Sequence, residues 1–115
     1  MMTHLVLMKP RANLSIDDRR ALVEAFDRAV REIPTVRAVR TGRRVKHGAG
    51  YESSAPDTAD YMVAIDFEDL AGLQSYLRHP AHDELGVRFG QSLSSALVYD
   101  FEAGGIEERP LRALR

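Results

Sequence analysis

The hydrophobic and polar positions of this chain follow two periods, and their order predicts four strands and two helical regions. Runs with period-two alternation, or apolar on both parities, are typical of strands and occupy residues 4–9, 36–45, 59–67 and 96–102. Apolar residues at helical spacing occupy residues 15–33 and 69–92. The order strand, helix, strand, strand, helix, strand predicts a ferredoxin-like α+β fold (βαββαβ), with a four-stranded antiparallel sheet and its helices on one face.

The second helical region contains a proline that must interrupt it. Pro80 disfavours the helical conformation at His79, so the first segment should end near Arg78. Proline is favourable at the first position of a helix, which predicts a new helix capped by His79, with His82 one turn inside it. We call this segment, Arg78 to His82, the histidine turn. It should end one helix and start the next.

The remaining helix boundaries follow from caps and breakers. Ser15, with Asp18 three residues later, forms a start similar to a capping box, and Pro34 ends the first helix. In the segment that runs from the central proline toward residue 92, Gly86 and Gly90 predict an interrupted helix.

The second predicted strand carries an unusual number of arginines among its valines. Charge of this kind is typical of a strand at a sheet edge, where it discourages pairing with another molecule. A basic patch for an anionic ligand is the alternative interpretation. The arginines are Arg37, Arg40, Arg43 and Arg44. The following stretch, residues 46–58, is rich in glycine, serine and proline, and is expected to be a surface loop or a lid.

The strands are apolar on both parities, whereas the predicted helices can cover only one face of the sheet. An uncovered apolar face is too large for a stable monomer to leave in water. The sequence therefore predicts a two-fold symmetric homodimer with sheet facing sheet.

Composition limits the classes of partner. A length of 115 residues with 44% apolar and 29% charged positions fits one domain. A net charge of −1 gives no attraction to nucleic acid or to acidic membranes, and no segment is long and apolar enough to span a bilayer. The absence of cysteine excludes disulfides and thiol chemistry, and fits a reducing cytoplasm, where we expect the protein.

His82 is the strongest candidate for chemistry. At the start of a helix, the positive dipole end disfavours its protonated form, so a neutral imidazole should be available to accept a proton. Tyr76 is a candidate to stabilise the oxygen of an enolate. A purely structural interpretation stays open, in which His79 caps the helix, His82 packs against the first strand and His4 is an ordinary strand residue. Pro80 disrupts the one-face spacing that paired metal ligands need, so no metal is expected.

Several segments together resemble the stress-responsive A/B barrel (Dabb) family, whose members form dimeric α+β barrels. The resemblance covers residues 4–102, which predicts a Dabb-like domain at 1–102 and a C-terminal extension at 103–115. Its carriers are His4-Leu5-Val6-Leu7, Ile33-Pro34 with Val36 and Gly42, Phe67-Glu68-Asp69, and Tyr76-Leu77-Arg78-His79-Pro80-Ala81-His82.

The family includes plant stress proteins, members with no known reaction, and a polyketide cyclase that closes a ring by aldol chemistry without metal or cofactor. Resemblance to that cyclase implies His82 as general base, Tyr76 as the group that holds the substrate carbonyl, and His4 as a pocket residue. Tyr61 replaces a further pocket histidine of the cyclase, and can donate a hydrogen bond but does not titrate near neutrality. Tyr61 and His79 are the candidate substrate-binding residues.

Three functions are compatible with these observations. The first is a cofactor-independent cyclase or lyase that acts on a small hydrophobic β-keto compound. The second is a non-enzymatic stress-responsive or ligand-binding barrel, and the third is a cofactor-independent monooxygenase, as in other dimeric α+β barrels. A cavity on which Tyr76, His82 and His4 converge would favour catalysis.

Overall fold

The structure of the chain is a computed structural model that describes residues 1–105. The predicted extension lies outside the described residues, apart from its first three positions. The elements, in order, are β1 (Met2–Pro10), α1 (Ile16–Glu32), β2 (Val36–Arg43), the short 3-10 helix η1 (Gly50–Ser53), β3 (Tyr61–Phe67), α2 (Leu70–Arg78), α3 (Pro80–Ser92) and β4 (Leu93–Glu102).

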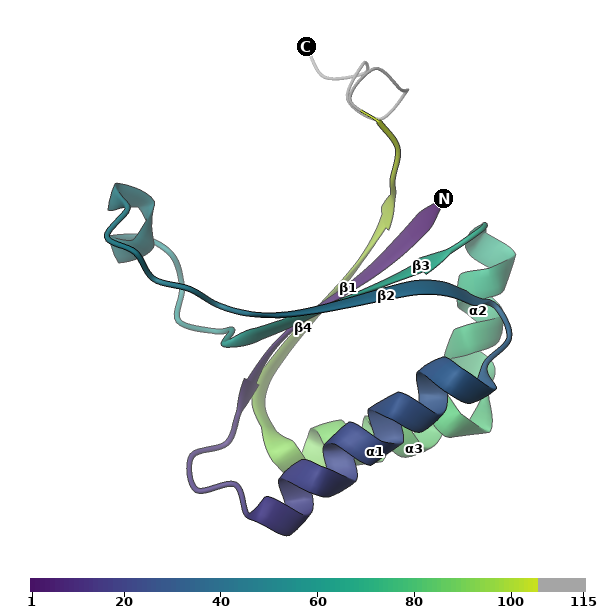
Figure 1. Cartoon of the computed structure of the whole chain (residues 1–115), viewed down its shortest axis with the longest axis horizontal. Coiled ribbons are helices and arrows are strands. Elements are labelled where there is room, and N and C mark those ends of the chain that lie inside the picture. Colours follow the sequence, from purple (N-terminus) through teal and green to yellow (C-terminus); the bar gives the residue numbers. More distant parts are fainter. Residues whose placement is uncertain (106–115) are drawn as a thin grey trace.

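The strands form one antiparallel sheet in the order β2-β3-β1-β4. Figure 1 shows α1, α2 and α3 together on one side of this sheet. The predicted ferredoxin-like α+β fold is therefore confirmed, and the arginine-rich β2 lies at a sheet edge, as its composition indicates.

The core lies between the sheet and the helices. Along β1, the side chains of His4, Val6 and Met8 face the helices and are buried, whereas Leu5 and Leu7 on the other parity are only partly buried. The helical side of this layer is made by residues at helical spacing, which bury their apolar surface against the strands. Its most buried members are Ala29, Ile33, Leu73, Tyr76 and Ala81.

The histidine turn has the predicted geometry. α2 ends at Arg78, and α3 starts with Pro80 in its first turn. His79 lies between them in an extended conformation, and its Nδ1 accepts a hydrogen bond of 3.0 Å from the backbone N–H of Ala81. One residue thus ends one helix and caps the next.

The prediction of an interrupted third helix is wrong. α3 is continuous through Gly86 and Gly90. Each glycine costs about 1 kcal/mol of helix stability relative to alanine. The helix nevertheless buries Ala81 and Leu85 and packs against α1, and this tertiary burial outweighs the local cost.

The connection between β2 and β3 is more ordered than its glycines and serines indicate. The carboxylate of Glu52 accepts hydrogen bonds from the backbone N–H groups of His47 and Ala49, at 3.0 and 2.6 Å. These bonds hold the start of η1. In Figure 1 this hairpin end stands away from the helices, at the left of the molecule.

The face of the sheet opposite the helices is uncovered within residues 1–105. Its centre is apolar, with Leu5 and Leu7 on β1 and Met62 on β3, and it continues onto β4. There, Tyr99 and Phe101 lie 6.2 Å apart between ring centroids and are about half exposed. None of the helices in this part of the chain is long and apolar enough to cross a membrane.

We expect Ser15→Ala to lower the free energy of unfolding by about 1 kcal/mol, because the Ser15 hydroxyl accepts the hydrogen bond of 3.0 Å from the backbone N–H of Asp18 at the start of α1. Urea denaturation measures the loss. Ser75→Ala, at an exposed position inside α2, is the matched control, and should leave stability equal or slightly higher. Equal losses in both variants would contradict the capping role.

Candidate functional site

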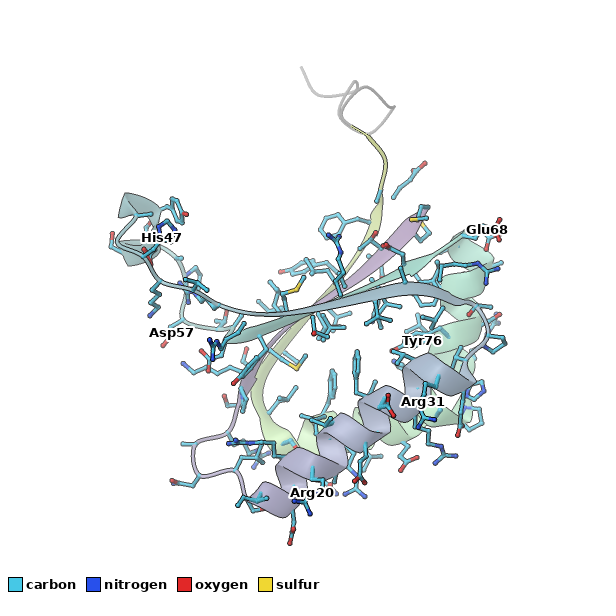
Figure 2. The ribbon with its side chains drawn as sticks, in the orientation of Figure 1. Arg20, Arg31, His47, Asp57, Glu68 and Tyr76 are labelled. Atoms are coloured by element: carbon cyan, nitrogen blue, oxygen red, sulfur yellow. The ribbon has the colours of Figure 1, made fainter. Side chains whose placement is uncertain are left out.

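The fold brings three aromatic rings into one cluster, which we call the ring cluster: His4 from β1, Tyr76 from α2 and His82 from α3. The Tyr76 ring lies edge-on to both imidazoles, with centroid distances of 5.7 Å to His4 and 4.9 Å to His82. Figure 2 shows Tyr76 pointing from its helix toward the sheet. The three residues singled out for catalysis in the sequence are therefore neighbours in space.

Tyr76 is a neutral hydrogen-bond donor in a buried setting. It is 1% exposed and packs on the Phe67 ring, at a centroid distance of 5.2 Å. Burial raises its pKa to about 12, so the phenol keeps its proton at neutral pH. Its hydroxyl has no hydrogen-bond partner within residues 1–105. No side-chain oxygen or nitrogen that lacks a partner is fully buried in this part of the chain, so the Tyr76 hydroxyl keeps a small contact with solvent.

His4 is oriented by a carboxylate that the sequence did not single out. Its Nδ1 lies 2.6 Å from Oδ1 of Asp100, its partner across the β1–β4 ladder. An ionised carboxylate can only accept a hydrogen bond, so Nδ1 of His4 is the donor, and the bond fixes the orientation of the imidazole ring. The sequence offered only a weak signal for this pair, because Asp100 follows Ala96 and Val98 on the same parity of β4 but shares that parity with Glu102.

His82 is half-buried, and its pKa is lowered from the ordinary value. Burial is the largest cause, and the neighbouring His4 lowers the pKa further, whereas Asp83 and the backbone of Leu77 act in the opposite direction. The pKa of His82 is thus shifted in the direction that the sequence predicts. The main cause of the shift is burial, whereas the sequence-based prediction started from the helix dipole.

The two candidate substrate-binding residues lie in different places. His79 caps α3 through its Nδ1, which leaves only Nε2 for a further contact. Tyr61 lies at the start of β3, is 44% exposed and lines a cavity between the sheet and α1.

This cavity has a volume of about 830 Å³, within the range of roughly 300–1,000 Å³ of small-molecule sites. Its walls are mainly apolar and come from α1, the sheet and the end of α3. They include Leu22, Phe26, Val30, Met8, Val63 and Phe89. The helical pattern of α1 predicts its three members of this wall, Leu22, Phe26 and Val30, as core, and nothing in that pattern indicates that they line a space.

The ring cluster does not line this cavity. His4 and Met8 are on the same face of β1, about 13 Å apart at a rise of about 3.3 Å per residue. The rings surround one end of the layer between sheet and helices, and the cavity opens at the other. The expected convergence of the three rings is present, but it lies beside the cavity and not on it. In residues 1–105, no group of three or more His, Asp or Glu side chains has an arrangement that could hold a metal ion.

These features define a ferredoxin-like α+β protein with a histidine–tyrosine cluster under its helices. The Stress responsive A/B Barrel Domain (Dabb) family matches residues 2–103. The chain therefore belongs to the Dabb family.

Individual relatives are distant. The chain is 21% identical over 98 residues to olivetolic acid cyclase from Cannabis sativa, covering 85% of this chain and 92% of the cyclase. Among solved structures, hydroxynitrile lyase from Passiflora edulis is similar with a TM-score of 0.76 and 14% identity, over 95% of this chain and 96% of that one. A dimeric ferredoxin-like protein of unknown function from Jannaschia is similar with a TM-score of 0.71 and 24% identity, over 89% and 98%.

We expect the imidazole of His82 to titrate below 6.5 in the folded protein, and His4→Gln to raise that pKa without restoring it fully. The variant removes the influence of His4, but leaves burial, the larger cause. NMR titration of the imidazole signals measures both values. A midpoint at or above 6.5 in the intact protein would contradict the buried environment of His82.

The same shift predicts the direction of pH-dependent stability. Between the lowered pKa of His82 and its ordinary value, the unfolded chain binds more protons than the folded chain, so stability increases with pH in this window. His82 therefore contributes fully to the stability of the fold at pH values above its pKa in the unfolded chain. This contribution is lost as the pH falls through its lower pKa in the folded chain.

Proposed function

We propose that this protein is a cofactor-independent lyase or cyclase that acts on a small carbonyl compound. In this proposal His82 is the general base, Tyr76 donates a hydrogen bond to the oxygen that becomes negative, and His4 supports them. The observation that carries it is the ring cluster, which combines a neutral imidazole with an unpaired, protonated phenol at van der Waals distance.

The chemistry needs only these groups. His82 removes a proton from the carbon α to a carbonyl, the C–H electron pair forms the enolate, and the Tyr76 hydroxyl stabilises the enolate oxygen. In the ring-forming direction, the enolate carbon bonds to a second carbonyl carbon, and the resulting alkoxide takes the proton back from His82. The cleavage direction reverses these steps, so both a cyclase and a lyase fit one arrangement.

Asp100 gives His4 a defined role in this scheme. Its carboxylate accepts the hydrogen bond from Nδ1 of His4 and thereby fixes the His4 ring beside Tyr76. His4 also disfavours protonation of His82, which keeps the base ready near neutral pH. At the cavity, Tyr61 is the proposed contact for the far end of an extended substrate, as an exposed phenol on a mainly apolar wall.

The comparisons support the class of reaction. Two similar proteins are named as a cyclase and a lyase, olivetolic acid cyclase and hydroxynitrile lyase. The proposal for this chain rests on its own residues, and these relatives add that the fold accommodates such chemistry.

We expect His82→Gln to lower the exchange of α-protons for deuterium in β-keto thioesters by at least about 100-fold, the usual minimum contribution of a positioned base. NMR of a panel of such thioesters in heavy water measures the exchange. Tyr76→Phe should also slow it, since the enolate oxygen loses its donor while the ring packing stays.

His47→Gln is the control for this experiment. His47 lies on the projecting hairpin end, far from α2 and α3 in Figure 2, and its replacement should leave exchange unchanged. Exchange that survives in His82→Gln at the wild-type rate would remove His82 from the mechanism.

A specific observation favours a second candidate, a non-enzymatic ligand-binding barrel. The large cavity has no member of the ring cluster in its wall. A ligand held there need not meet His82 at all. Ligand binding without α-proton exchange in the intact protein would favour this second function.

We also propose that two copies of the chain pair through the uncovered face of the sheet. The face is apolar at its centre, and Thr3 and Asp66 on the two central strands satisfy each other by a hydrogen bond of 2.7 Å from the Thr3 hydroxyl to Asp66. A solved structure with similar fold is named as dimeric. Sheet-to-sheet pairing would remove the exposed rings of Tyr99 and Phe101 from water.

We expect light scattering to give about twice the chain mass of 12.9 kDa at micromolar concentration. Tyr99→Glu should shift the protein to monomer, because it places a charge in the pairing face. Val87→Glu, an exposed valine on α3, is the matched control and should stay dimeric. A wild-type monomer would exclude the pairing.

A further inference from the structure

The apolar cavity between α1 and the sheet has a charged rim. Arg19, in the second turn of α1, and Arg43, the last residue of β2, both line it. Within the described chain, neither guanidinium is held in an ion pair or a side-chain hydrogen bond. By contrast, Arg28, Arg31 and Arg37 each pair with a carboxylate.

We propose that this cavity selects an amphiphile, with an apolar chain or ring inside and an anionic head group, carboxylate or phosphate, held at the rim by Arg19 and Arg43. The inference takes the cavity as the ligand site of the proposed function. It concerns what is bound, and does not depend on proton transfer at His82.

The walls determine the apolar part of the ligand. Leu22, Phe26 and Val30 project from one face of α1 toward Met8 and Val63 on the sheet. A polar group placed among them would lose its hydrogen bonds to water without replacement, whereas a hydrocarbon chain would gain free energy by leaving water.

The rim determines the charge of the head group. A guanidinium presents planar N–H donors that match the oxygens of a carboxylate or phosphate, and two such groups from different elements can hold one anion between them. Asp27 also lines the cavity, but its Oδ2 already accepts a hydrogen bond of 2.8 Å from Nε of Arg31. Its charge is thereby balanced, which leaves the rim positive.

A role in anion binding explains why residue 43 is an arginine, which its position on an edge strand does not explain. Any charged residue on β2 would discourage edge pairing. Arg43 is the arginine of that strand whose position, on the helix-facing parity opposite Tyr61, brings it to the cavity.

Isothermal titration calorimetry with decanoate, decyl phosphate and decanol tests the proposal. We expect either anion to bind the intact protein with a Kd at least about ten-fold lower than that of decanol. Which anion binds more tightly identifies the head group. In Arg19→Gln/Arg43→Gln, the anions should lose this advantage, while the affinity for decanol stays the same.

Arg20→Gln is the matched control. Arg20 neighbours Arg19 in sequence but lies on the outer side of α1 in Figure 2 and does not line the cavity. Its replacement should leave anion binding unchanged. Rising salt should weaken the binding of decanoate but not of decanol, an independent measure of the charge contribution.

Equal affinity for decanol and both anions, or no binding of any of them, would overturn the proposal. Anion binding with no α-proton exchange would refute catalysis alone, and exchange without anion selection would refute the present inference alone.

Discussion

The break at His79 and Pro80 is the constraint on which the candidate site depends. In one continuous helix of 3.6 residues per turn, Tyr76 and His82 would point in directions about 120° apart, so only one of them could face the sheet. Pro80 ends α2 and starts α3 in a new direction, and the His79 cap replaces the hydrogen bond that the turn would lose. The Tyr76 ring then packs against His4 on the sheet, and the His82 ring packs against Tyr76. The interaction that joins the two helices is therefore also the one that assembles the chemistry.

Burial then gives each ring its protonation state. Tyr76 lies deep between helix and sheet, where desolvation raises its pKa and keeps the phenol a neutral donor. His82 lies less deep, where desolvation lowers its pKa and favours the neutral imidazole, which can accept a proton. His4 sits under the same helices, but its partner Asp100 is on the edge strand β4, with its side chain 39% exposed. The cluster is thus apolar toward the core and polar toward the β4 edge, where the Asp100 carboxylate meets solvent.

The sequence predicted most of the fold, since local signals and burial agree in this chain. The cap at Ser15, the edge position of β2 and the histidine turn all follow from residues within a few positions of each other. The continuity of α3 depends instead on packing against α1, which no local pattern contains. The neighbours of His82 were predictable through the family resemblance, but the pairing of His4 with Asp100 depends on strand register across 96 positions of sequence. The cavity could not be predicted for a related reason. A helix face that lines a cavity has the same pattern of apolar residues in the sequence as a face that packs tightly against a sheet.

The separation of ring cluster and cavity along β1 bears on function more directly than the identity of any one side chain. Val6 and the apolar residues above it lie between the two ends, about 13 Å apart. A compact molecule held near Tyr61 and Arg43 does not meet His82, and a compact molecule at His82 leaves the cavity empty. A single ligand that uses both ends has to be extended, with its reactive carbonyl inward and its other end at the arginine rim. The length of the ligand thus distinguishes binding in the cavity from catalysis at the ring cluster, since different residues serve the two functions.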